Sequence, residues 1–143
     1  MNPKEDVEQL MNEGIEFAAK MLCEHGEFYP FGVVRKADGS ILHAGAADGT
    51  EQPPSASLIE ILRSNYRQEA QAGRYSATAM FHDVRITPPG KSAKSDAIQV
   101  ELEHSGGYCA DVFFPYTRDS GGNVSFGETF ASKRDLTVFG RAS

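Results

Sequence analysis

The chain has little positive charge and no basic stripe. Its 143 residues contain 14 Lys and Arg against 20 Asp and Glu, a formal net charge of −6 at pH 7. Nucleic-acid binding depends on Lys and Arg that neutralise phosphates, and anionic membranes likewise attract basic segments. The sequence therefore predicts neither a nucleic-acid partner nor a membrane partner.

Cysteines and long apolar runs are also scarce. Cys23 and Cys109 are the two cysteines, and neither belongs to a C-x-x-C motif. Such lone cysteines are typical of reduced, buried residues in the cytosol, although a disulfide between them stays open because pairing depends on distance. No apolar run approaches the roughly 20 residues of a membrane helix, and no signal-peptide core is visible. We expect a cytoplasmic protein.

Familiar catalytic and ligand-binding motifs are absent from the sequence. It has no G-x-S-x-G, P-loop or G-x-G-x-x-G pattern. The histidines do not show the spacing of a metal site; they are His25, His43, His82 and His104. The sequence thus predicts no metal and no cofactor, names no reaction, and favours a non-enzymatic protein.

Two segments have the three- and four-residue apolar spacing of an amphipathic helix. The first covers residues 3–24 and follows Asn2, which suits the N-cap position before a proline. The second begins at Ser55 or at Ser57, and Ser57 fits a capping box with Glu60.

Two strand pairs are expected from alternating patterns and turn residues. Asp38-Gly39 predicts a two-residue type I′ turn, which would place Val34 opposite His43. Later in the chain, a three-residue turn at 105–107 would place Glu101 opposite Asp111. In that second hairpin apolar and polar residues alternate. Ile98, Val100 and Leu102 should face the core, and Gln99, Glu101 and Glu103 the solvent.

The element order is α-β-β-α-β-β-β with a possible further strand. This predicts an α+β fold in which two helices cover an antiparallel sheet of about five to six strands. We expect one domain over residues 1–130 and a flexible polar tail over 131–143. The long third strand, from residue 74, is expected at a sheet edge, where it could pair with another chain.

Charged residues on the third to fifth strands are candidates for a site. Glu101 and Asp111 would repel each other across the hairpin, and Arg85 could lie between them. They are either a carboxylate pair with one raised pKa, suited to acid–base work or cation binding, or a solvated face with salt bridges. His82, on an otherwise apolar face, is either a hydrogen-bonded core histidine or a ligand.

Aromatic side chains form the second group of candidates. Strand alternation sends about half of them into the core and leaves the others on the opposite face or its rim. That face would be a protein-binding patch, a third packing layer, or a set of scattered exposed aromatics. Tyr29, Phe31, Tyr75, Phe81, Phe113 and Tyr116 belong to this group.

Several motifs resemble those of a family of small uncharacterised bacterial proteins. They are E-F-Y-P-F-G at 27–32, D-V-R-I-T-P-P-G at 83–90 and F-F-P-Y at 113–116. The similarity spans residues 24–130 and brings no activity with it. The element order also resembles the roadblock and longin-type domains, and this resemblance implies a dimerising scaffold module.

Two functions follow from these observations. The first is a non-enzymatic protein-interaction module whose partner is another protein or a second copy of the chain. The alternative is a small-molecule-binding protein or enzyme with a pocket between the sheet and the second helix, using His82, Arg85, Glu101 and Asp111. The candidate binding residues are Tyr29, Phe31, Phe81, His82, Arg85, Glu101 and Asp111.

Overall fold

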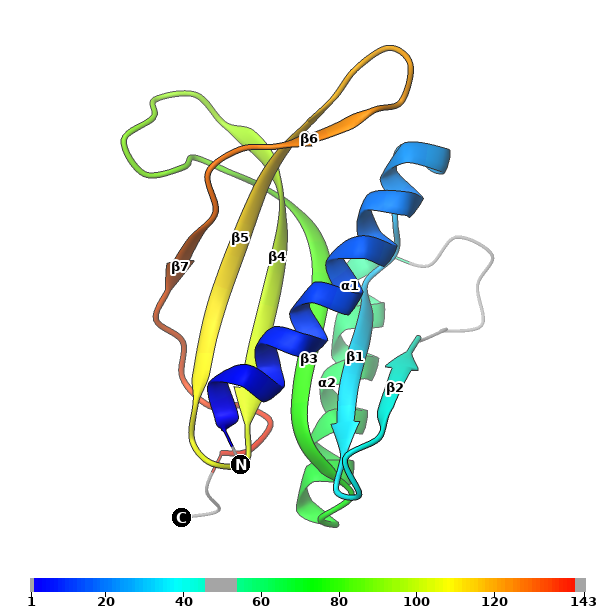
Figure 1. The fold of residues 1–143 in the computed structure, drawn as a ribbon, viewed down its shortest axis with the longest axis vertical. Helices are drawn as coiled ribbons and strands as arrows, with labels where there is room; N and C mark the ends of the chain where they lie inside the picture. The colour runs from blue at the N-terminus through cyan, green and yellow to red at the C-terminus, as the bar shows by residue number, and fades with distance from the viewer. Residues whose placement is uncertain (1, 46–53, 141–143) are drawn as a thin grey trace.

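The computed structural model describes residues 2–45 and 54–140. Over these residues it contains two helices and seven strands, and it confirms the predicted α+β class with an antiparallel sheet (Figure 1). The elements are α1 (Pro3–His25), β1 (Phe31–Lys36), β2 (Ile41–Ala44), α2 (Ser55–Gln71), β3 (Tyr75–Ile86), β4 (Ser95–His104), β5 (Cys109–Arg118), β6 (Val124–Phe126) and β7 (Phe130–Ser132). Residues 48–57, which include two prolines and several turn residues, predict a loop, and part of this segment lies outside the described residues.

The strands form one sheet in the order β2-β1-β3-β4-β5-β6, and β7 also pairs with β5. The long strand β3 therefore lies in the middle, paired with β1 on one side and β4 on the other. The prediction that it forms an edge was wrong, because sequence order says nothing of how strands are inserted between one another. Among the described residues, β2 is the outer strand beside β1.

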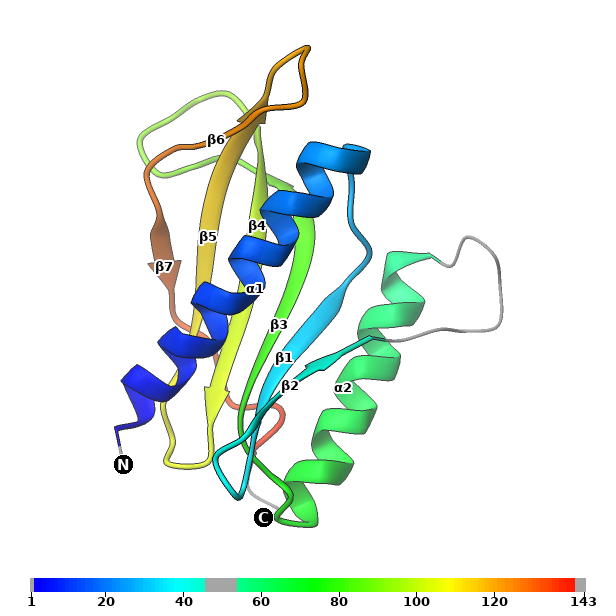
Figure 2. The same cartoon turned by 45° about the vertical axis from the view of Figure 1, so that its right-hand side comes forward.

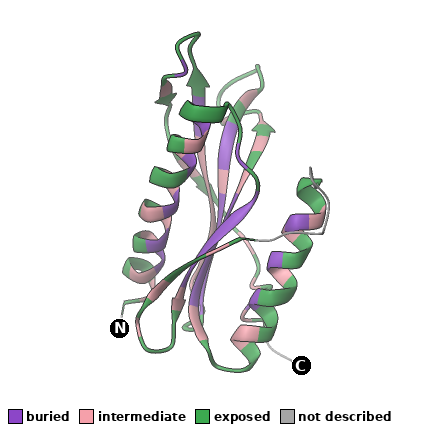
Figure 3. Ribbon diagram, turned by 90° about the vertical axis from the view of Figure 1, so that its right-hand side faces the viewer, coloured by how far each residue is buried: buried purple, intermediate pink, exposed green. Residues whose placement is uncertain are grey.

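The two helices cover opposite faces of the sheet, so the fold has three layers (Figures 2 and 3). Neighbouring residues of β1 show this, since Val33 belongs to the core under α1 and Val34 to the core under α2. The core under α1 includes Leu10 and Phe81, and the core under α2 includes Tyr66. Strand β1 is therefore covered on both faces, and its first four residues are buried.

Both helices begin at residues whose local contacts explain the start, and one of these starts was predicted. The Asn2 side chain accepts a hydrogen bond from the Glu5 amide at 3.2 Å, which confirms the predicted N-cap of α1. The capping box at Ser57 was wrong. The N-cap of α2 is Pro54, three residues before Ser57, and no side chain caps the helix; the Ser57 amide instead donates to Pro54 O at 3.1 Å.

The first hairpin differs by one residue from the predicted register. Val34 is opposite Leu42 rather than His43, and the Lys36 amide donates to Ser40 O at 2.8 Å around a three-residue turn. A type I′ turn needs positive φ at both central residues. Here only Gly39 has it, with φ of 92°.

The second hairpin confirms the predicted register, with Glu101 opposite Asp111. Ile98, Val100 and Leu102 face the core under α1 as expected. The carboxylates on the other face are nevertheless buried: Glu101 is 4% exposed and Glu103 is 1% exposed. The prediction of a solvated carboxylate face was therefore wrong.

The C-terminal segment covers these carboxylates. Residues 131–143 were expected to form a flexible polar tail, but 131 and 132 belong to strand β7 and residues 134–139 contact β4 and β5, while 141–143 lie outside the described residues. Val138 is buried in the core under α2. A short segment with a few apolar residues and several donors can pack in this way without any periodic pattern, which is why the sequence did not reveal it.

Candidate functional site

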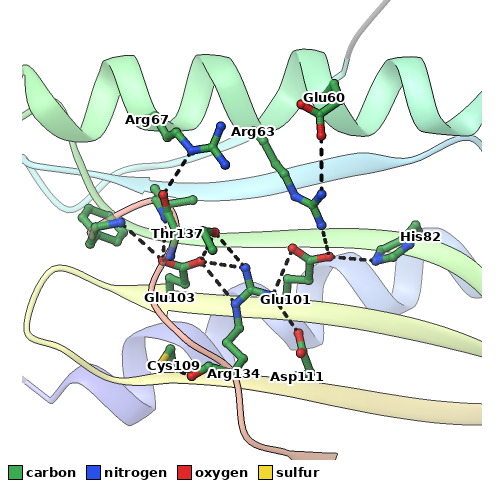
Figure 4. Close-up of polar contacts among 12 residues, drawn as sticks. Glu60, Arg63, Arg67, His82, Glu101, Glu103, Cys109, Asp111, Arg134 and Thr137 are labelled. Atoms are coloured by element: carbon green, nitrogen blue, oxygen red, sulfur yellow. Dashed lines mark hydrogen bonds and ion pairs between the residues drawn. The ribbon is translucent and has the colours of Figure 1, made fainter. Parts of the chain in front are cut away.

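Arg134 lies at the centre of the buried carboxylates, which we call the carboxylate cluster (Glu101, Glu103 and Asp111; Figure 4). Its guanidinium donates to Glu103 Oε2 at 2.8 Å and to Asp111 Oδ1 at 2.9 Å. It also makes an ion pair with Glu101 Oε1 at 3.2 Å. Arg85 was expected in this place, but its side chain points to solvent and pairs with Asp96.

The Glu103 carboxylate attaches the C-terminal segment to the sheet. Its Oε1 accepts hydrogen bonds from the backbone amides of Thr137 at 2.9 Å and Val138 at 2.8 Å, and from Phe139 at 3.3 Å. The Thr137 hydroxyl donates to Oε2 at 2.8 Å. Successive backbone N–H groups are a common cradle for an anion, and here the anion is a side chain of the same protein.

Glu101 is held in its ionised form by a hydrogen bond with His82 and by the charges of two arginines. Arg63 of α2 donates to Oε2 at 2.9 Å, and His82 Nε2 lies 3.0 Å from the same oxygen. Burial by itself raises the pKa of Glu101, but the hydrogen bond with His82 and the charges of Arg134 and Arg63 outweigh it and lower the pKa to about 2. The predicted alternative of a carboxylate with a raised pKa is therefore wrong for Glu101.

This arrangement suits a structural role better than acid–base chemistry. His82 is hydrogen-bonded inside the fold, which is the first of the two interpretations drawn from the sequence. No group of three or more His, Cys, Asp or Glu side chains suited to a metal ion was found among residues 2–45 and 54–140. The cluster brings together His82, Glu101 and Asp111 as predicted, adds Arg63 and Arg134, and leaves Arg85 outside.

The predicted aromatic face is not formed. Phe31 and Phe81 are opposite each other on β1 and β3, and their rings stack at 4.8 Å in the core under α1. Gly14 makes room for Phe81, since a Cβ atom at Gly14 would lie 1.9 Å from Phe81 Cζ. Both phenylalanines are thus largely buried, although Phe31 contributes to the wall of one hollow, and of these three aromatic candidates Tyr29, 48% exposed, is the most accessible.

The other aromatic candidates are separated. Tyr75 packs beside Tyr66 under α2, and Phe113 stacks on Phe130 of β7 at 4.9 Å. Tyr116 lies in the core under α1 and donates to Asp83. The even spacing of aromatics along strands does not tell which layer covers each of them.

Both cysteines are free thiols. Cys109 is partly buried, and its thiol donates to the Arg134 carbonyl at 3.0 Å. Burial and then the neighbouring Glu103 carboxylate raise the pKa of the Cys109 thiol. Cys23 was expected to be buried, but it is exposed near the end of α1, because it lies beside the helix's buried stripe rather than within it.

Three of the exposed large apolar side chains lie around the outer edge of β2. Leu42 of β2 is 46% exposed, Phe17 of α1 is 40% exposed and Tyr29 is 48% exposed. We call these three residues the edge patch. The rings of Phe17 and His43 are 6.3 Å apart, and Phe17 and Tyr29 line one hollow of about 410 Å³ together with Gly45, the residue after β2.

The edge patch flanks β2 from both faces of the sheet. Leu42 is opposite Val34, whose side chain points to the α2 side, whereas Phe17 comes from α1 on the other side. Sequence reasoning missed two of the three residues. Phe17 follows the apolar spacing of the first helix, which predicts burial, and the one-residue shift of the first hairpin places Leu42 on the other face of the sheet from the one that the predicted register gives.

The comparisons with known proteins leave the site to be interpreted from its geometry. No family model, no curated protein and no solved structure matches the chain. In the described part of the chain, neither helix is long and apolar enough to cross a membrane.

Proposed function

We propose that the protein is a non-enzymatic interaction module that pairs with a second copy of itself through the outer edge of β2. The observation that carries this proposal is an edge strand flanked on both faces by the exposed apolar edge patch. An edge strand offers unpaired N–H and C=O groups to a neighbouring strand. Covering the edge patch at the same time would add a hydrophobic contribution to that pairing.

The edge of β2, a strand of four residues, lacks proline and acidic or basic side chains, two of the features that usually prevent such pairing. Natural edges are protected by proline, charged side chains, bulges or very short strands. Strand β2 reads Ile-Leu-His-Ala and has no proline and no Lys, Arg, Asp or Glu. On the opposite edge of the sheet, β6 and β7 are three-residue strands that each cover a different part of β5. The two edges are thus protected to different degrees.

Two copies related by a two-fold axis would meet with antiparallel β2 strands. This arrangement is isologous, because the same surface serves both partners and the assembly closes at two copies. It would extend the sheet across the dimer and place each Leu42 near the partner's β2. The alternative of a small-molecule site at His82, Glu101 and Asp111 has less support, since these groups already bind Arg134, Arg63 or each other.

Sedimentation velocity across micromolar concentrations tests the proposal. We expect the wild-type protein to form a dimer, and Leu42→Lys to shift it to monomer by placing a charge in the pairing edge. Ile61→Lys is the matched control, because Ile61 is 38% exposed and lies on α2 rather than on β2. A strictly monomeric wild type, or a dimer that tolerates Leu42→Lys as well as Ile61→Lys, would contradict the proposed edge pairing.

A further inference from the structure

A second concave region lies at the other end of the sheet. The loop between β3 and β4 and the segment between β6 and β7 approach each other over Pro115 of β5 (Figure 1). The pocket between them has a volume of about 470 Å³, and small-molecule sites usually have about 300–1,000 Å³. We call it the lysine pocket, because Lys91 and Lys94 stand at its wall.

The apolar walls of the lysine pocket are built from rigid groups. Pro88, Pro89 and Pro115 contribute proline rings, whose φ angles are fixed covalently. Phe130 contributes a phenyl ring held in place by its stack on Phe113, with an interplanar angle of 13°. Flat, rigid walls suit a flat apolar ligand and lose little conformational freedom when it binds.

Backbone hydrogen bonds hold both sides of the pocket. The Lys91 amide donates to Pro88 O at 3.1 Å, and Gly90 takes a φ of 76° to complete that turn. On the other side, the Gly127 amide donates to Pro115 O at 2.8 Å. The pocket is therefore formed before any ligand arrives.

The charge of the lysine pocket differs in sign from that of the whole chain. Lys91 and Lys94 contribute two positive charges and Glu128 one negative charge, whereas the chain carries a net charge of −6. No salt bridge joins any of these three residues to another of the described residues. The two ammonium groups are thus available to an anion.

Other hollows along α1 and at the edge patch differ from the lysine pocket in their lining. The shallow surfaces along α1 are lined by acidic residues that include Glu8, Glu13 and Glu16, and these outnumber Lys20, which lines one of the two surfaces beside His43. The hollow at the edge patch is apolar and has Glu27 at its wall. Positive charge and rigid apolar walls occur together at the lysine pocket.

We propose that the lysine pocket binds a small organic anion with one carboxylate on a flat apolar body. The carboxylate would pair with Lys91 and Lys94, and the apolar body would lie against the proline rings and Phe130. This site lies beside β5 and β7, at the edge of the sheet opposite to β2. It goes beyond the proposed self-association and does not depend on it.

A matched pair of probes tests this inference on the full chain. 3-Phenylpropanoate and 3-phenylpropanamide share one apolar body and differ in charge, and their binding can be followed by NMR chemical shifts and by calorimetry. We expect the carboxylate to bind with a Kd of about 1 mM or below, with shift changes at Ala93, Gly127 and Phe130. The amide should bind about fivefold more weakly, and added salt should reduce the difference.

Three variants separate the charge effect from a change in folding. The double variant Lys91→Gln with Lys94→Gln should bind the carboxylate about fivefold more weakly and leave amide binding unchanged. Glu128→Gln should bind the carboxylate more tightly, and Lys20→Gln, on α1, should change neither. Equal binding of both probes, shift changes away from the pocket, or insensitivity to the lysine substitutions would overturn the inference. None of these results depends on whether the protein is a dimer.

Discussion

Replacement of Arg134 by alanine should destabilise the protein strongly, because it removes the cation shared by the carboxylate cluster. The Arg134 side chain is 9% exposed, and those of Glu101 and Glu103 are 4% and 1% exposed. Removal of one partner from a buried ion pair costs about 3–5 kcal/mol, because the other charge stays buried without compensation. A protein of this size has a total stability of about 5–15 kcal/mol.

The groups that surround each carboxylate determine how much stability Arg134→Ala should remove. Arg63 and His82 still hold Glu101, and backbone amides still hold Glu103. Asp111, at 15% exposure, can recover some hydration. The loss should therefore be near the lower end of that range, about 3 kcal/mol, and it should lower the melting temperature by roughly 10 °C.

Urea denaturation at pH 7, followed by circular dichroism, measures the loss. Arg85→Ala is the control, because Arg85 and Asp96 form an ion pair whose side chains are 63% and 51% exposed, and such exposed pairs contribute about 0–1 kcal/mol. Adding Glu103→Gln to Arg134→Ala should recover part of the stability, since it removes one uncompensated charge. If Arg134→Ala costs no more than Arg85→Ala, the cluster does not hold the C-terminal segment as we infer.

Three further predictions concern the core and the termini of the elements. The pKa of Glu101 is lowered from 4.5 to about 2. Its ionised form therefore adds about 3 kcal/mol to the free energy of unfolding above pH 4.5, and this contribution is lost as pH falls towards 2. Glu101→Gln should flatten this part of the curve of stability against pH. Gly14→Ala should cost about 1–3 kcal/mol in urea denaturation, because its Cβ would overlap Phe81, whereas Gly45→Ala, with nothing within 4 Å, should cost little. Arg118→Ala should cost about 1–2 kcal/mol by thermal denaturation, because Arg118 Nε donates to Leu22 O at 2.8 Å near the end of α1; an unchanged melting temperature would contradict that role.

Local sequence determined the features that depend on a few neighbouring residues. The N-cap at Asn2 and the pairing of Glu101 with Asp111 were both predicted and are both observed. Each depends on turn or capping geometry within about five positions of the chain or within one hairpin. Alternation along β4 likewise identified which of its residues face α1.

Tertiary structure alone decided what covers each face of the sheet. Period-two alternation separates the two faces of a strand but does not tell whether the second face meets water, a helix or a distant segment. The buried Phe81 and Glu103 owe their environment to α1 and to the C-terminal segment, respectively. Arg134 lies 23 residues from Asp111 and 31 residues from Glu103, in a segment without periodic pattern. A contact of that kind depends on how the whole chain closes around the sheet, and no short stretch of sequence specifies it.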